Sequence, residues 1–520
     1  MVSMSRRTFC TGAGMLTAAV MLGGARLATA ASKGTALPIP PELRPDRNGK
    51  IRLIAESGKM SFRPGVATPT YGFNGPFLGP AIRVRRGRTV DVSIDNRLCD
   101  TITVHWHGLI IPGEVDGGPY QLVPGGSARD VQLAIDQPAA TLWYHPHIYP
   151  ATAELVIMGL AGLFIVDDDE TDRLNLPSRW GVDDIPLVLQ DRRFNDDGSF
   201  FHRFNEIAVA MGYVGDVMLV NGAVQPTARS ARGWLRLRIL NGSNARNYRL
   251  AASDNRALYV IATDGGLLEE PVEVKDLPIA AGERFEVLVD ARNGKPFDLV
   301  SLPVDQPIRR LPPFDRPLPL VGFQPDGAAG DRKLPDALVS LPSLPESPPP
   351  VSQGLVMQMY RDMNAKRVMM ETGFMAMVKS GKTDPAVVAK INDAIVNGPE
   401  LPLKEQLTAN GINGKPFSFT EPGFRAPINT DLVWAISEET DKMLHPVHIH
   451  GCQFRVLTMD GKAPPAYMAG WKDTVPIENA GNAEIFVRFP LPAPAKAPYM
   501  AHCHILEHED SGMMTEFTVG

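Results

Sequence analysis

Short runs of alternating hydrophobic and polar residues recur along most of the chain. Clear examples are residues 81–87, 89–94 and 101–107, followed later by residues 234–240 and 285–290. This alternation places successive side chains on opposite faces, as in a half-buried β-strand, and glycine often separates the runs. Because many short strands need a second sheet against which to bury their apolar faces, we expect an all-β chain built from β-sandwiches.

Charged and proline-rich segments divide the predicted strands into three parts. An acidic segment at 167–170 ends the first part, and the prolines between 342 and 350 form a stiff linker before the third. We therefore predict one domain over residues 31–168, a second over 169–335 and a third over 336–520. A chain of 520 residues is long enough for this number of domains.

The third part opens with a segment that does not alternate. Seven of the chain's 21 methionines lie between Met357 and Met377, and capping residues predict a helix from Asp384-Pro385 to Asn397-Gly398. We expect a methionine-rich, partly helical insertion over about residues 355–400. Methionine often fills irregular gaps in a core, and thioethers are also soft ligands that prefer Cu(I). Both interpretations stay open at this point.

The N-terminal segment carries an export pattern instead of a strand pattern. Ser5-Arg6-Arg7-Thr8-Phe9 is a twin-arginine signal, and an apolar run from Met15 to Ala25 leads to a cleavage site at Ala28-Thr29-Ala30. We expect residues 1–30 to be a signal peptide that directs the folded protein through the twin-arginine export machinery to the bacterial periplasm. A membrane anchor is the alternative, but the apolar run is short for a helix that spans a bilayer.

Composition and charge change this picture little. Hydrophobic residues make up 44% of the chain and charged residues 21%, as in an ordinary globular protein. The net charge of −6 gives no indication of nucleic-acid binding. We expect a periplasmic monomer without a membrane span. Cys99 and Cys452 could form a disulfide in an oxidising compartment or stay as two buried thiols.

Histidine is distributed far less evenly than the other residue types. The chain has 11 histidines, and all except His202 fall into four short clusters, which favours a core role for His202. The clusters are His105-Trp106-His107, His145-Pro146-His147, His445-Pro446-Val447-His448-Ile449-His450, and the histidines at 502, 504 and 508. Each cluster contains two histidines separated by one residue, and this spacing places both imidazoles on one face of a strand. The clusters therefore predict metal sites.

The last cluster adds sulfur ligands to the histidines. Cys503 lies between His502 and His504, and His508 and Met513 follow shortly after. On a strand, the two flanking histidines point to one face and Cys503 points to the other. A metal bound by Cys503, His508 and Met513 would then lie opposite a second site at His502 and His504. A thiolate, imidazoles and a weak axial thioether are typical of blue copper, and the short covalent link between the two sites suits electron transfer.

With these motifs the chain resembles the multicopper oxidase family. The similarity includes H-W-H-G at 105–108, E-V-D-G-G-P at 114–119, M-G-L-A-G at 158–162 and H-C-H-I-L-E-H-E-D-S-G-M-M at 502–514. Within the family the chain is most similar to the bacterial periplasmic copper efflux oxidases, which are laccase-like cuprous oxidases. The resemblance implies three consecutive cupredoxin-like domains, each a Greek-key β-sandwich or barrel, and four copper ions.

The resemblance also implies which residue binds which copper. The implied type 1 ligands are His445, Cys503, His508 and, in the axial position, Met513. The implied type 2 ligands are His105 and His448. The implied ligands of the type 3 pair are His107, His145, His147, His450, His502 and His504. Asp116 and Glu509 match acids that deliver protons in relatives, although Asp116 beside Gly117 is also a common turn residue.

The activity implied by this resemblance is oxidation of a one-electron donor at the type 1 copper, with transfer through Cys503 and reduction of O2 to water. Candidate donors are Cu(I) and phenols or other small molecules. The residues that match a substrate Cu(I) site in copper efflux oxidases are Met357, Asp362, Asp441 and Met443. A cuprous oxidase in copper tolerance, with phenol oxidase activity, is therefore the first hypothesis. The alternatives are a laccase-like oxidase of phenols or other metal ions, and a non-catalytic copper-binding protein of the periplasm.

Overall fold

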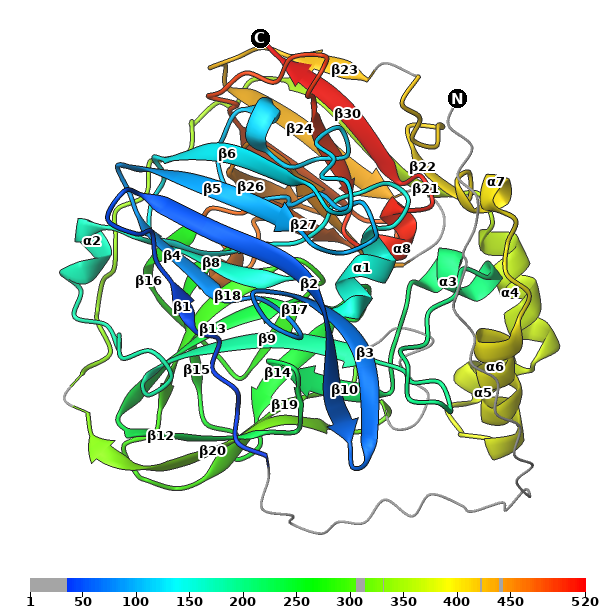
Figure 1. The fold of residues 1–520 in the computed structure, drawn as a ribbon, viewed down its shortest axis with the longest axis horizontal. Helices are drawn as coiled ribbons and strands as arrows, with labels where there is room; N and C mark the ends of the chain where they lie inside the picture. Colours follow the sequence, from blue (N-terminus) through cyan, green and yellow to red (C-terminus); the bar gives the residue numbers. More distant parts are fainter. Residues whose placement is uncertain (1–34, 305–313, 331, 421–422, 439–442) are drawn as a thin grey trace. The chain divides into compact units, whose positions relative to one another are not determined.

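The computed structural model describes residues 35–520, except 305–313, 331, 421–422 and 439–442 (Figure 1). The predicted signal peptide and Asp441 therefore lie outside the described residues. Within the described ranges, no helix combines the length and the apolar character that crossing a membrane requires.

Two four-stranded sheets form the first sheet pair, over residues 42–167. One sheet has the order β1 (Glu42–Leu43), β4 (Ala81–Arg85), β8 (Gly162–Asp167) and β7 (Ala140–Tyr144). The other has the order β3 (Val66–Phe73), β2 (Lys50–Arg63), β5 (Arg88–Asn96) and β6 (Ala128–Ile135). Buried residues alternate with more exposed ones along β5, and Leu53, Val92 and Phe164 from different strands share one hydrophobic core.

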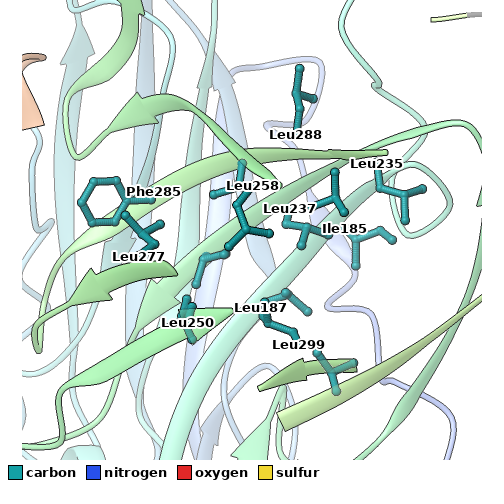
Figure 2. Close-up of a cluster of buried hydrophobic side chains, with 14 of the residues drawn as sticks. Ile185, Leu187, Leu235, Leu237, Leu250, Leu258, Leu277, Phe285, Leu288 and Leu299 are labelled. Carbon is teal, nitrogen blue, oxygen red and sulfur yellow. The ribbon is translucent and has the colours of Figure 1, made fainter. Parts of the chain in front are cut away.

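The second sheet pair spans residues 184–329. Its seven-stranded sheet has the order β11 (Ala223–Val224), β10 (Val217–Val220), β9 (Asp184–Arg192), β13 (Trp234–Asn241), β18 (Arg284–Asp290), β15 (Leu258–Thr263) and β16 (Gly266–Val274). Its five-stranded sheet has the order β12 (Thr227–Arg232), β20 (Leu318–Ala329), β19 (Phe297–Ser301), β14 (Tyr248–Ala252) and β17 (Asp276–Ile279). Leu187, Leu237 and Phe285 from the first sheet meet Leu250 and Leu299 from the second in the core that Figure 2 shows.

The third sheet pair spans residues 351–519 and consists of two five-stranded sheets. One has the order β22 (Asn410–Ile412), β21 (Val351–Met359), β24 (Leu432–Glu438), β28 (Asn482–Val487) and β26 (Phe454–Met459). The other has the order β23 (Phe424–Ala426), β30 (Met514–Val519), β29 (Tyr499–Cys503), β25 (His445–Ile449) and β27 (Thr474–Ile477). In the second of these sheets β29 lies between β25 and β30, so His502 and Cys503 lie at the end of a central strand.

Helices are short and lie outside the sheets. The first group is η1 (Gly113–Val115), α1 (Thr152–Met158), α2 (Asp169–Asp172) and α3 (Glu206–Met211). The second group is α4 (Asp362–Glu371), α5 (Phe374–Ser380), α6 (Pro385–Asn397), α7 (Leu403–Gln406), η3 (Ala466–Met468) and α8 (Leu506–Glu509). Figure 1 shows α4, α5 and α6 gathered together, beside α3. The predicted helix at 385–397 is confirmed as α6, and the side chain of Asp384 accepts a hydrogen bond from the Ala386 amide at its start.

The prediction of an all-β chain of paired sheets is confirmed, with two corrections. Residues 101–107 do not form the predicted strand, because their only ladder contacts are isolated bridges from Ile102 to Val123 and from His105 to His145. The suggested Cys99–Cys452 disulfide is absent. Both thiols are free, Cys99 is exposed, and only Cys452 is buried.

Candidate metal centre

The first candidate metal site lies at the end of β29, around Cys503. The Sγ atom of Cys503 is 3.5 Å from Nδ1 of His445 and 3.7 Å from Nδ1 of His508. All three side chains are fully buried. The antiparallel pairing of β25 with β29 sets His445 near Cys503, and α8 returns His508 to the same point. The amide of Ile505 donates to the sulfur at 3.4 Å, an interaction that tunes the redox potential of a copper thiolate.

Met513 lies beside this site in sequence and in the fold. It is fully buried in the hydrophobic cluster that also contains Cys503. Its carbonyl accepts a hydrogen bond from the Cys503 amide at 3.1 Å, and its own amide donates to the His508 carbonyl at 2.8 Å. These backbone contacts tie Met513 to two of the three residues above. The axial role of its thioether stays a prediction.

The second candidate metal site collects the remaining eight clustered histidines. His147, His450 and His502 form one group whose ring nitrogens lie within 4.8 Å of one another. His107, His145 and His504 form a second group by the same criterion. His105 and His448 complete the set, with their Nε2 atoms 3.3 Å apart. The structure thus brings together all eight histidines that were expected to bind the type 2 and type 3 coppers.

Backbone pairing explains how these histidines meet. In the first sheet pair, the bridge between His105 and His145 joins two histidine motifs directly. In the third, His448 pairs with His502 across β25 and β29. His504, just beyond β29, donates its amide to the Pro446 carbonyl at 2.6 Å. Alternation on strands therefore accounts for part of the arrangement, while loop hydrogen bonds fix the rest.

The electrostatic state of the rings suits metal binding. Burial lowers the pKa of His107, His145 and His504 well below the ordinary value, and neighbouring histidines add to that effect. Burial likewise lowers the pKa of His147, His450 and His502. These imidazoles are therefore neutral, which is the form that binds a metal. His504 supports the fit of these residues to copper. No other described residue forms a hydrogen bond with either of its buried ring nitrogens, so a ring nitrogen is available to bind a metal.

Asp116 and Glu509, the two predicted proton donors, lie next to the histidine groups. The Oδ2 atom of Asp116 is 2.7 Å from Nδ1 of His450, and the Asp116 carbonyl is 2.9 Å from Nδ1 of His105. The two carboxylate oxygens of Glu509 lie 3.5 Å from Nδ1 of His147 and 3.3 Å from Nδ1 of His502. Burial, followed by the charge of Asp510, raises the pKa of Glu509. Both acids are thus placed against predicted type 3 ligands.

Asp473 is a site residue that the sequence did not reveal. Its Oδ1 atom lies 3.0 Å from Nε2 of His107, and its carbonyl oxygen lies 2.9 Å from Nδ1 of His448. One residue therefore orients two predicted ligands of different copper types. The only available signal was a Lys472-Asp473 pair directly before an apolar strand, which by itself is an ordinary loop feature.

The residues that match a substrate Cu(I) site are placed less completely. Met357 and Met443 are buried in the hydrophobic cluster that contains Cys503. Asp362 begins α4, and its carboxylate pairs with the Lys366 amine at 2.6 Å. Asp441 lies outside the described residues, so this set of four stays a prediction. His202, expected to be a core residue, is mostly buried, with Nε2 3.5 Å from an oxygen of Glu507.

Comparison with known proteins agrees with this geometry. Models of the multicopper oxidase family match residues 55–171, 176–301 and 396–520, one match for each sheet pair. A multicopper oxidase of Staphylococcus aureus is 35% identical over 91% of this chain and 90% of its own length. The cell division protein FtsP of Escherichia coli is 32% identical over 100% of this chain and 99% of its own length.

A solved structure extends the likeness to the fold. The laccase-like multicopper oxidase CueO from an Ochrobactrum species has a TM-score of 0.79 and 36% identity. The match covers 93% of this chain and all of that one. The three sheet pairs are thus cupredoxin-like domains, as expected from the sequence. The chain therefore belongs to the multicopper oxidase family, and it is an oxidoreductase of that type with copper as its cofactor.

Proposed function

We propose that this protein couples four one-electron oxidations at a type 1 copper to the reduction of one O2 to two waters at a trinuclear copper cluster. The observation that carries this proposal is the position of Cys503, whose sulfur faces His445 and His508 while its neighbours His502 and His504 join the eight-histidine site. When bound, copper supplies the one-electron redox chemistry at both sites. The balance is O2 with four electrons and four protons giving two waters.

The protein residues hold the two sites at a fixed covalent separation. Cys503 and His502 are neighbours on one strand, so the path from the thiolate to an imidazole runs through a few covalent bonds of the two side chains and the backbone between them. Full burial of these residues excludes bulk water from the path. Rigid and dry surroundings reduce the reorganisation that accompanies a change of charge, which favours rapid electron transfer.

Asp116 and Glu509 are proposed to supply the protons that the reaction consumes. This is supported by their contacts with ring nitrogens of His450, His147 and His502. A carboxyl group within hydrogen-bond reach, or one water further away, is the geometry that proton delivery requires. Both acids are buried, so each can donate a proton to the histidine site and is shielded from bulk solvent.

Cu(I) is the proposed electron donor, in copper tolerance, with phenols as further substrates. The first support is the burial of Met357 and Met443 in the cluster that contains Cys503. The second is the exposure of thioethers on α4 and α5: Met363 and Met370 on α4 are 65% and 59% exposed, and Met375 on α5 is 38% exposed. Exposing an apolar methionine side chain to water is unfavourable, and binding of Cu(I) by its soft thioether gives a reason for that exposure.

A laccase-type oxidase without a Cu(I) role is the second candidate. It is supported by the CueO from Ochrobactrum, which is described as having oxidase activity towards lignin model compounds and lignosulfonate. FtsP is named as a cell division protein and not as an oxidase, so the third candidate is a copper-binding protein without turnover. That outcome predicts copper binding with no O2 consumption.

The experiment that separates these functions is steady-state O2 consumption by the copper-loaded protein, with Cu(I) and with a phenol in parallel. The test variant combines Met357→Leu with Met443→Leu, and the control is Met468→Leu, a buried methionine outside the Cys503 cluster. Selective loss of Cu(I) oxidation in the test variant supports a cuprous oxidase. Unchanged Cu(I) and phenol rates support the laccase interpretation, and absence of both activities in the wild type contradicts an oxidase.

Export to the periplasm is proposed on the basis of Arg6 and Arg7 in the twin-arginine motif. The test is cell fractionation of the full chain and of a variant with Arg6→Lys and Arg7→Lys. The wild type should appear in the periplasmic fraction and the variant in the cytoplasm. The same distribution for both would contradict export by this route.

A further inference from the structure

The second sheet pair contributes none of the clustered histidines, yet it reaches the histidine site. Gly282, in the loop before β18, has a φ of +85°, and a Cβ atom added there would lie 2.8 Å from Cγ of the His504 ring. Two residues further on, the Arg284 guanidinium is fully buried. The segment 282–284 is therefore packed against the site at a distance that leaves no room for solvent.

Arg284 binds Asp473 in a two-pronged arrangement. Its Nη1 donates to Oδ1 at 2.7 Å and its Nη2 donates to Oδ2 at 2.5 Å. The Nε atom donates to the Thr141 carbonyl of the first sheet pair at 3.2 Å. Paired hydrogen bonds of this kind fix the plane of a carboxylate as well as its position. Arg284 thus holds one carboxylate of the third sheet pair in a single orientation while it contacts the first.

Other buried groups hold the same segment. The amides of Asp473 and Thr474 each lie 3.3 Å from Oδ2 of Asp264, which also forms an ion pair with the Lys472 amine at 2.9 Å. The Nε2 group of Gln453 donates to Oδ2 of Asp473 at 2.9 Å. A buried ion pair is by itself weak evidence of a stabilising role, because removing charges from water offsets much of what their pairing returns. A positional role explains it better.

The orientation of His107 is what this network controls. His107 presents Nδ1 to the neighbouring histidine His145, at 3.4 Å from its Nε2 atom, whereas His105 and His448 face each other through Nε2. The other nitrogen, Nε2 of His107, is directed at Oδ1 of Asp473, 3.0 Å away. A hydrogen bond to a fixed carboxylate keeps the proton on Nε2 and leaves the Nδ1 lone pair for a metal.

We propose that Arg284 is a positioning residue of the trinuclear site: it fixes the Asp473 carboxylate, which in turn selects the Nδ1-ligating tautomer and ring orientation of His107. On this view the second cupredoxin-like domain shapes the copper site without providing a ligand. The inference rests on the proposed function, because it takes His107 to be a type 3 ligand.

The test compares Arg284→Met and Asp473→Asn with the control Arg236→Met. Arg236 is also a buried arginine, and it pairs with Glu286 without contacting Asp473 or any of the clustered histidines. Each protein is loaded with copper, and we measure the copper-to-protein ratio, the blue absorption of the type 1 site and the EPR signals. A coupled type 3 pair is EPR-silent, so its loss or uncoupling changes the fraction of copper that EPR detects.

We expect Arg284→Met and Asp473→Asn to retain the blue absorption and to lose type 3 copper or its coupling, while the control matches the wild type. Full copper content and wild-type EPR in both test variants would overturn the inference, as would the same loss in Arg236→Met.

If Arg284→Met does not fold, Gln453→Met serves instead. It removes one donor to Asp473 and should weaken trinuclear copper retention against a chelator by roughly 10-fold, and unchanged retention would overturn the inference. A wild type that binds no trinuclear copper would contradict the proposed function itself.

Discussion

The imidazoles of His105 and His448 meet with their Nε2 atoms 3.3 Å apart, although the two residues lie 343 positions apart in the sequence. Each belongs to a different cupredoxin-like domain, and a complete further domain lies between them in the sequence. The site that they share can therefore form only when the first and third domains have both folded and docked. Copper binding at this site therefore indicates that both domains have folded and docked.

Replacing one of these two histidines should remove one copper and leave the others. His448→Ala deletes a ring whose Nδ1 is held by the Asp473 carbonyl, so no nearby side chain takes its place. We expect the copper-to-protein ratio to fall by about one. We expect the rate of O2 consumption to fall roughly 100-fold or more, because several kcal/mol of transition-state stabilisation by that copper are lost. Copper analysis and an oxygen electrode provide the measurement. His202→Ala is the control, and a full copper content in His448→Ala would contradict the assignment.

Replacing the thiolate should separate the two sites. Cys503→Ser keeps the backbone and removes the soft ligand that copper needs for its intense blue absorption. We expect that absorption and the oxidation of any donor to disappear, while the type 2 EPR signal persists because the histidine site is intact.

The matched control for this change is Cys99→Ser, since Cys99 is free and exposed. It should keep the colour and the activity of the wild type. Blue absorption retained in Cys503→Ser would show that the type 1 copper lies elsewhere.

The sequence predicted which histidines come together in the fold better than it predicted the strands that carry them. The histidine motifs stand out because imidazoles repeat at a short spacing in a chain that has few others. The expected strand at 101–107 failed because its backbone groups bond to single bridges and to a loop instead of a continuous ladder. The Trp106 amide donates to the Asp116 carbonyl at 3.3 Å, and the bridges are Ile102 to Val123 and His105 to His145. Asp473 and Arg284 were missed for a different reason. Their roles arise from contacts 189 positions apart, and no local pattern marks them.

The second domain offers a test of buried charge that is independent of copper. Burial alone would raise the pKa of Glu286, but the charges of Arg236 and Arg238 outweigh it and lower that pKa to about 2. A folded-state pKa below the unfolded value of 4.5 stabilises the protein above about pH 4.5, and the stabilisation is lost as the pH falls towards 2. The shift corresponds to about 3 kcal/mol at neutral pH.

Thermal unfolding of copper-free protein checks this value. Glu286→Gln should lower the unfolding midpoint clearly at pH 7, and its difference from the wild type should shrink between about pH 4.5 and pH 2. Glu270→Gln, on an exposed position, is the control. A difference that stays constant over this pH range would mean that Glu286 is not charged in the folded protein.

Proton delivery can be separated from electron delivery at Asp116. Its carboxylate lies 2.7 Å from Nδ1 of His450, and Asn at this position keeps the shape but cannot carry a proton. We expect Asp116→Asn to be reduced by the donor as fast as the wild type, and to be reoxidised by O2 roughly 10- to 1,000-fold more slowly. Stopped-flow absorption of the blue copper during reduction and reoxidation distinguishes the two steps. Equal reoxidation rates would remove Asp116 from the proton path.

The central claim is that this protein uses electrons from a one-electron donor to reduce O2 to water. The most direct measurement is the ratio of donor oxidised to O2 consumed by the copper-loaded wild type, with hydrogen peroxide assayed in the same reaction. We expect four donor molecules to be oxidised for each O2, no peroxide, and no activity in Cys503→Ser. A ratio of two with peroxide as the product, or copper binding without any O2 consumption, would contradict it.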